Sequence, residues 1–384
     1  MEDIRFIDER GSFVLNQPEN YSYLYFPLAS TAGLKSAVTP NLGGDAKVDQ
    51  ETFLLEPVSA ENLHNNRSAR NFWFLTDGGG AYSAAGASAE QEAARFSSGQ
   101  DDSRLEAGFM WQTLTRFSKQ FQLVSTVTSF IPKDVNVEIM YVTVKNQGES
   151  VRKLTACGAI PVFGRSADNL RDHRNVTSML HRIKTVENGV LVSPTMSFDE
   201  KGHQPNSRIY YVAGSTGSGN PPESFYPTVE EFIGEGGTFL HPRAVFESHK
   251  GCPAGSFRAG KEAMGALRFE AVVLEPGEEA DYILLLGVEN SEEEIQRVSR
   301  QYDTVQKVKQ TLKSTRDYWQ KQVAASFHTG DRDFDCWMKW ICFQPFLRRL
   351  FGCSFLPHHD YGRGGRGWRD LWQDCLSLLL MEPG

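Results

Sequence analysis

The chain has 384 residues, of which 40% are hydrophobic and 23% charged, and its formal net charge at pH 7 is −8. This composition is typical of a soluble globular protein with more than one domain. The negative charge and the absence of any Lys/Arg-rich run argue against a nucleic-acid partner. No segment approaches the ~18 consecutive apolar residues of a membrane span, so no membrane partner is expected.

The cysteines indicate a reduced, cytoplasmic protein. No two of them form a C-x-x-C pair, so neither a zinc site nor a disulfide framework is expected, and the predicted metal set is empty. The N-terminus also lacks the basic region and apolar stretch of a secretion signal. The six cysteines are Cys157, Cys252, Cys336, Cys342, Cys353 and Cys375.

Residues 1–288 show the patterns of β-structure. Residues 121–130 and 135–144 are rich in β-branched side chains and alternate in part between apolar and polar residues. The second of these segments is expected to place Val135, Val137, Ile139 and Tyr141 on one face.

Turn signals separate these predicted strands. The turn at 146–150 predicts a hairpin that continues into a strand at 154–160, and 267–274 with 282–286 form another strand–turn–strand unit. Many strands with turns between them predict a large antiparallel sandwich.

Two stretches of this half have the composition of loops. Residues 76–100 are rich in Gly, Ala and Ser, and we expect them to form an ordered excursion from the sandwich. Residues 198–225 are polar and are interpreted as a second long loop.

The pattern changes to helical at Ser291. Ser291 and Glu294 have the spacing of a capping box, and 292–326 is predicted to form two helices. Residues 289–328 are therefore interpreted as a helical linker. The apolar positions that support this are Ile295, Val298, Tyr302, Val305, Val308 and Leu312.

Two further helices are expected in 329–384. The first begins near Asp333 and kinks or ends near Pro345. The second runs from about Arg369 to Met381, and the partners of both are expected beyond Gly384, because two such helices cannot bury their apolar faces alone. The expected apolar face of the first helix is Phe334, Trp337, Met338, Ile341 and Cys342. The side chains expected to be buried in the second are Trp372, Cys375, Leu376, Leu379 and Leu380.

Charged and amide groups gather at the start of this last helix. Asp370 and Asp374 share one face, while Arg369 and Gln373 share the next. Glycines flank Arg363 in the preceding loop, which would allow a ligand to approach the backbone closely. Carboxylates and guanidinium groups together suit the vicinal hydroxyls of a sugar. The alternative is a helix start whose acidic residues merely complement the helix dipole.

Other interpretations of the loop are weaker. The glycine-rich stretch 362–367 lacks the Gly-Lys-Ser/Thr of a P-loop. His358, His359 and Asp360 could hold a metal, but adjacent side chains in an extended loop point to opposite sides.

The segment Gly-Arg-Gly-Trp-Arg-Asp-Leu-Trp-Gln-Asp374 resembles the Gly-aromatic-Arg-Asp-x-x-Gln-Asp motif of glycoside hydrolase family 94, the cellobiose and chitobiose phosphorylases. The order of predicted elements is also similar. Segments 23–28, 39–45 and 61–73, together with Trp372, resemble the 1,2-β-oligoglucan phosphorylase branch of that family.

The resemblance implies a galactose-mutarotase-like supersandwich, a helical linker and the truncated start of an (α/α)6 barrel. It also implies an inverting phosphorylase that cleaves β-1,2-glucooligosaccharides with inorganic phosphate as co-substrate, without a cofactor, to give α-glucose 1-phosphate. By resemblance, Arg369 and Asp374 would bind sugar hydroxyls in the −1 subsite, supported by Asp370 and Gln373, with Arg363 facing the same pocket.

The catalytic residues of the family are not expected within this chain. The family's general acid is an Asp in a Trp-Asn-Asp-Gly motif, and no such motif occurs here. The chain alone is therefore expected to be inactive. Two alternatives remain open: a non-catalytic glycan-binding or scaffold module, and an inverting glycoside hydrolase of the same architecture. The patterns give no oligomeric state.

Overall fold

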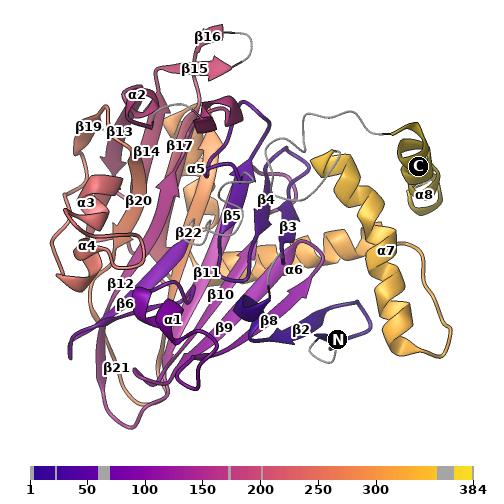
Figure 1. The fold of residues 1–384 in the computed structure, drawn as a ribbon, viewed down its shortest axis with the longest axis horizontal. Helices are drawn as coiled ribbons and strands as arrows, with labels where there is room; N and C mark the ends of the chain where they lie inside the picture. Colours follow the sequence, from indigo (N-terminus) through magenta and orange to yellow (C-terminus); the bar gives the residue numbers. More distant parts are fainter. Residues whose placement is uncertain are drawn as a thin grey trace.

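The computed structural model describes residues 4–21, 24–58, 70–171, 174–199, 202–352 and 367–382. A large antiparallel sheet and a smaller one face each other across a hydrophobic core, and the helices of the last third of the chain lie outside them (Figure 1). The predicted antiparallel sandwich is therefore confirmed.

Among the described residues the large sheet has eleven strands. In spatial order these are β1 (Ile4–Phe6), β2 (Phe13–Asn16), β8 (Asp102–Gly108), β9 (Trp111–Ser118), β10 (Leu123–Phe130), β11 (Val137–Asn146), β22 (Glu279–Glu289), β17 (Ile209–Thr216), β14 (Gly189–Pro194), β13 (His181–Val186) and β19 (Phe257–Ala259).

The facing sheet and two smaller sheets complete the β-structure that the described residues form. The facing sheet has the order β18 (Ser224–Thr228), β20 (Ala263–Arg268), β12 (Arg152–Val162), β6 (Asn71–Thr76) and β7 (Ala81–Ser83), and β21 (Val272–Leu274) also pairs with β12. The small sheets are β3 (Phe26–Ala29), β4 (Lys35–Val38) and β5 (Gly44–Lys47), and the hairpin of β15 (Met196–Asp199) and β16 (Gly202–Pro205).

Short helices lie between the strands of the sandwich in the chain, and in the described residues four longer helices come after its last strand. The short elements are η1 (Pro18–Asn20), α1 (Ala89–Ala94), η2 (Ala167–Arg171), α2 (Arg174–Ser178), α3 (Val229–Ile233) and α4 (Arg243–Phe246). The longer helices are α5 (Glu292–Gln301), α6 (Val305–Gln322), α7 (Arg332–Phe351) and α8 (Trp368–Met381).

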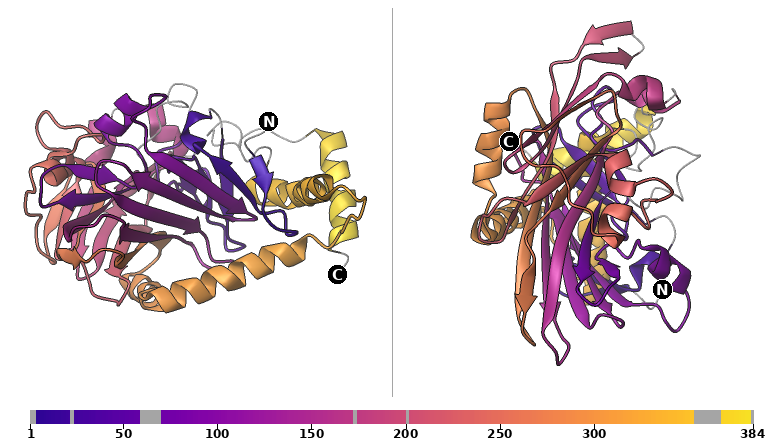
Figure 2. Two further views of the ribbon diagram at one scale, coloured as in Figure 1. Left: turned by 90° about the horizontal axis from the view of Figure 1, so that it is seen from below. Right: turned by 90° about the vertical axis from the view of Figure 1, so that its left-hand side faces the viewer.

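In strand β11, successive side chains point to opposite faces of the sheet. Met140 and Val142 point into the core between the sheets, whereas Ile139 and Tyr141 share the opposite face, as predicted, and this is the outer face of the large sheet. That outer face is covered by α5 and α6 through residues such as Val298 (Figure 2). The strand is thus buried on both faces.

The N-terminus of α5 has one half of the predicted capping box, because the Glu294 carboxylate accepts from the Asn290 backbone N–H rather than from that of Ser291. The Ser291 hydroxyl accepts a hydrogen bond from the Glu294 backbone N–H, at 3.2 Å. The linker forms two helices, as expected, with the break between Gln301 and Val305.

The predicted hairpin across 146–150 is wrong. Strand β11 pairs with β10 and β22 in the large sheet, whereas β12 pairs with β6, β20 and β21 in the facing sheet. The turn therefore carries the chain from one sheet to the other. Both strands are largely apolar, so their sequences do not reveal which sheet each joins.

The interpretation of 198–225 as a loop is also wrong. This stretch contains β17, which lies between β14 and β22 within the large sheet. Tyr210, Tyr211 and Val212 of β17 are fully buried. By contrast, 76–100 is an ordered excursion that contains β7 and α1, as expected.

Candidate functional site

Helix α7 forms the base of the candidate site and is anchored to the sandwich. Its N-cap Asp331 accepts hydrogen bonds from the backbone N–H groups of Asp333 and Phe334. The ring of Phe343 is fully buried and stacks on Phe109 of the β8–β9 turn, with ring centroids 4.4 Å apart. Burial of aromatic surface at this contact fixes α7 against the sandwich.

Polar contacts fix the same helix to the start of the chain. The Trp340 indole N–H donates to the carbonyl of Gly11 at 2.7 Å, and the Lys339 ammonium donates to the carbonyl of Glu9 at 2.7 Å. The Lys35 ammonium, from β4, donates to the last-turn carbonyl of Leu350 at 3.0 Å. The middle and the C-terminal end of α7 are thereby held by the β-domain.

The expected apolar face of α7 is not the face that packs. Phe334, Trp337 and Ile341 are exposed, Trp337 to 59%. The side chains toward the sandwich lie at spacings of three and four on another face: Cys336, Trp340, Phe343 and Leu347. Helix α7 is apolar around most of its circumference, so a second apolar face packs on the sandwich while the expected face is left exposed. The helix does not end at Pro345 but continues to Phe351.

Helix α8 carries the predicted sugar-binding residues. Its N-cap, Gly367, has an extended backbone and makes no side-chain cap. The side chains of Arg369 and Gln373 are exposed in the first turns. Asp370 lies in the same turns of the backbone, and Arg363 lies outside the described residues.

Asp374 differs from its neighbours because it is partly buried against α7. Its carboxylate lies 3.6 Å from the Arg348 guanidinium, and its side chain is 13% exposed. The sequence did not identify Arg348, because the contact joins two helices and leaves no spacing pattern. A carboxylate oriented by a guanidinium can accept hydrogen bonds from sugar hydroxyls. The ion pair equally supports the alternative of a structural contact between the helices.

Two tryptophans stand beside these polar groups. Trp368 and Trp372 are one helical turn apart and are 81% and 58% exposed. Exposed indole rings next to charged side chains suit a surface that stacks on sugar rings. In contrast, burial raises the pKa of the Cys336 and Cys342 thiols, which disfavours a thiolate nucleophile on α7.

The apolar residues of α8 are exposed, which agrees with the expectation that α7 and α8 cannot bury their apolar faces alone. In this chain Met381 and Leu378 pack against the α7 cluster, and Arg349 pairs with Glu382. The exposed residues of this expected apolar face are Trp372, Cys375, Leu376, Leu379 and Leu380. The reason is that α7 presents too little surface to cover more than one edge of α8.

The described residues contain neither a metal-ligand cluster nor a membrane-spanning helix. No cluster of three or more His, Cys, Asp or Glu side chains able to hold a metal occurs among them. His358, His359 and Asp360 lie outside that part of the chain. No helix that the structure describes is long and apolar enough to cross a membrane.

Comparison with known proteins gives a family match over the sandwich. Residues 101–305, more than half of the chain, match the family profile "Glycosyl hydrolase 94, supersandwich domain". The chain is 23% identical over 260 residues to the N,N'-diacetylchitobiose phosphorylase of Vibrio proteolyticus, covering 67% of this chain and 30% of that protein.

A second relative is the 3-O-beta-D-glucopyranosyl-beta-D-glucuronide phosphorylase of Paenibacillus borealis, with 25% identity over 284 residues, 68% of this chain and 32% of that protein. The chain thus spans about a third of the length of these relatives.

Solved structures show weaker likenesses. A bacterial glucoamylase complexed with acarbose superposes with a TM-score of 0.42 at 10% identity, covering 78% of this chain and 38% of that one. A GalM/aldose epimerase homologue from C. elegans superposes with a TM-score of 0.37 at 11% identity, covering 70% of this chain and 99% of that one.

Proposed function

The chain belongs to the glycosyl hydrolase 94 family, and we propose that it is the N-terminal part of an inverting glycoside phosphorylase. The family match over residues 101–305 carries this proposal, supported by the two phosphorylase relatives. On this proposal residues 1–288 are the sandwich domain, 289–328 the linker and 329–384 the first helices of an (α/α)6 barrel. The cytoplasmic location suggested by the cysteine pattern is part of the same proposal.

The proposed substrates are β-1,2-glucooligosaccharides and inorganic phosphate, with α-glucose 1-phosphate as product. The resemblance of 23–28, 39–45 and 61–73 to the 1,2-β-oligoglucan branch supports this linkage. The names of the two relatives indicate different sugars, so the proposed linkage rests on those segments alone.

In the proposed reaction, this part of the protein needs only to bind the sugar. An inverting hydrolase needs an acid for the leaving oxygen and a base for water. A phosphorylase needs only the acid, because phosphate is already an anionic nucleophile. The residues of α8 would hold the sugar: Arg369 and Asp374 on its hydroxyls, Asp370 and Gln373 in support, with Arg363 facing the same pocket.

We propose that the general acid and the phosphate-binding groups lie in a segment beyond this chain. Without the acid, the rate should fall by about 10²- to 10⁴-fold. The 384-residue chain is therefore expected to be inactive alone. The length of the relatives and the exposed apolar face of α8 support this view.

The test uses the chain and a longer protein translated through the coding sequence that follows codon 384. Each is incubated with sophorotriose and phosphate, and glucose 1-phosphate is assayed. We expect turnover only by the longer protein. Turnover by the 384-residue chain at an ordinary enzymatic rate would refute the proposal that it is a fragment, and release of glucose without phosphate consumption would identify a hydrolase.

Variants of the longer protein test the roles of the α8 residues. Asp374→Asn and Arg369→Met should each lower kcat/KM at least about tenfold, since each removes a charged hydrogen bond to the sugar. Asp317→Asn, on the exposed side of α6, is the matched control and should leave kcat/KM unchanged. Equal activity of the Asp374 and Asp317 variants would remove Asp374 from the sugar site.

A further inference from the structure

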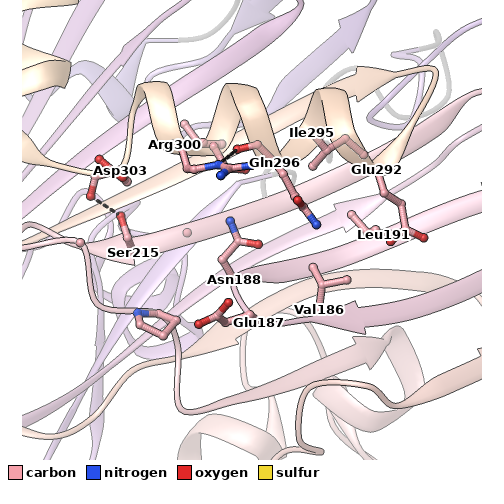
Figure 3. Close-up of a pocket in the computed structure, with 15 residues that line it drawn as sticks. Val186, Glu187, Asn188, Leu191, Ser215, Glu292, Ile295, Gln296, Arg300 and Asp303 are labelled. Carbon is pink, nitrogen blue, oxygen red and sulfur yellow. Dashed lines mark hydrogen bonds between the residues drawn. The ribbon is translucent and has the colours of Figure 1, made fainter.

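A groove lies between α5 and the outer face of the large sheet. It encloses a cavity of about 370 Å³, within the range of about 300–1,000 Å³ typical of small-molecule sites. The β13–β14 turn, β17 and α5 supply its walls (Figure 3). None of its residues comes from α7 or α8, so it is separate from the candidate site above.

The groove has an apolar floor. Leu191 and Leu285 come from the sheet and Ile295 comes from α5, and all three are at most 4% exposed. Aliphatic side chains of this kind can pack against the C–H face of a sugar ring, because that face is apolar.

Polar side chains also line the groove, and one of them, at its base, is unpaired. Ser299 is 5% exposed and lines the groove, yet its hydroxyl has no hydrogen-bond partner. A buried hydroxyl left unpaired is unfavourable by about 1–3 kcal/mol, so a ligand that pairs with it gains affinity. The side chains of Asn188, from the turn, and Gln296, from α5, extend into the same space (Figure 3).

The charges in the groove nearly cancel. Glu292 is paired with Lys184 at 2.9 Å, and Asp303 is paired with Lys307 at 2.8 Å. The charged lining residues that remain are one carboxylate, Glu187, and one guanidinium, Arg300. Such a site favours neither a cation nor an anion, but it offers both donors and acceptors.

We propose that this groove is a non-catalytic binding site for a neutral saccharide, holding one sugar ring or a short oligosaccharide. The amides of Asn188 and Gln296 would each donate to and accept from ring hydroxyls. Ser299 would pair with a hydroxyl at the base of the groove, and Ile295 would pack against the ring. This inference goes beyond the proposed phosphorylase function and does not depend on it.

The test measures binding to the purified 384-residue chain by titration calorimetry and saturation-transfer NMR. The probes are sophorose and cellobiose, with glucuronic acid as a charged comparison. We expect the neutral disaccharides to bind more tightly than the acid. Binding of neither disaccharide, or tighter binding of the acid, would overturn the proposal.

Variants locate the bound sugar. Ser299→Ala removes one hydroxyl from a helix that tolerates alanine, and together with Asn188→Ala it should weaken binding about fivefold or more. Gln310→Ala, on the exposed side of α6, is the control and should bind as the unchanged chain does. If the Ser299 and Asn188 variants bind normally while Asp374→Asn loses binding, the sugar lies at α8 and the groove is not a site.

Discussion

The sandwich buries nearly all of its apolar side chains, whereas the last two helices leave many of theirs exposed. In the sandwich, strands such as β11 bury both faces, one between the sheets and the other beneath α5 and α6. Helix α7 buries one apolar face and exposes another, and α8 exposes nearly all of its apolar residues, with Leu380 84% exposed. The described residues up to 328 therefore form a nearly closed unit, whereas α7 and α8 have apolar surface available for a further partner.

The first prediction concerns the most buried charges of the sandwich. Arg70 and Glu138 are at most 1% exposed, and the guanidinium also donates to carbonyls of residues such as Gly43. Glu138→Ala would leave the Arg70 charge buried without its partner, so the free energy of unfolding should fall by about 3–5 kcal/mol. Urea denaturation followed by circular dichroism measures this change.

A surface ion pair provides the control for this variant. Lys261→Met breaks the exposed Lys261–Glu230 pair and should change stability by at most about 1 kcal/mol. If the two variants are equally stable, the buried pair contributes no more than a surface contact, and this part of the comparison is wrong.

The second prediction uses two phenylalanines of one helix. Phe343 of α7 is fully buried, whereas Phe334 is 47% exposed. Phe343→Ala should cost about 3 kcal/mol, the lower end of the range for such changes, because α7 can open locally from the sandwich. Phe334→Ala should stay within about 0.5 kcal/mol.

Tryptophan fluorescence reports on this difference. Trp319 and Trp340 lie 6.1 and 6.2 Å from the Phe343 ring, so opening of α7 should change their emission before the sandwich unfolds. A larger loss for Phe334→Ala than for Phe343→Ala would mean that the packed and exposed faces of α7 have been assigned the wrong way round.

The third prediction is a pH dependence that originates within the sandwich. Burial, reinforced by the nearby Arg165 guanidinium, lowers the pKa of His181 to about 3. The unfolded chain takes up this proton near pH 6.5, whereas the folded chain does so only near pH 3. The stability associated with neutral His181 is therefore complete above about pH 6.5 and is lost progressively as the pH falls toward 3.

Between pH 7 and pH 5 this loss should be roughly 2 kcal/mol. In His181→Gln the slope of stability against pH over this interval should become much shallower, whatever the stability of the variant at pH 7. The exposed His328, between α6 and α7, is the control, and His328→Gln should keep the original slope. An unchanged slope in His181→Gln would contradict the assignment.

A sequence pattern predicts this structure well where it is compatible with a single arrangement of strands or helices, and poorly where it is compatible with several. The alternation of apolar residues in 135–144 allows only one assignment of side chains to the two faces of the strand, and the structure confirms that assignment. The turn at 146–150 fits either a hairpin or a crossing between sheets, because the pairing is decided by distant strands. Helix α7 has apolar residues on several sides, so its packed face depends on where Phe109 lies.

The candidate site shows the same limit. The motif correctly predicted a helix from about Arg369 to Met381, and α8 runs from Trp368 to Met381. The contact between Arg348 and Asp374 could not be predicted, because it requires knowing how α7 and α8 cross. The sugar-binding roles of the α8 residues remain predictions.

The last and smallest effect separates binding from folding at Asp374. In this chain Asp374→Asn removes an ion pair whose Arg348 side chain is 36% exposed, so solvent should screen it and stability should change by less than about 1 kcal/mol. Arg348→Met tests the other partner, and Arg349→Met, which breaks the exposed pair with Glu382, is the matched control. If all three variants melt close to the unchanged chain, Asp374 is not required to hold α8 in place. A loss of sugar turnover by Asp374→Asn in the longer protein can then be attributed to the sugar site.

The opposite outcome is that Asp374→Asn unfolds α8, as judged by a loss of helical circular dichroism that Arg349→Met does not show. The carboxylate would then be structural, and the sugar site would have to be assigned to other residues of the helix.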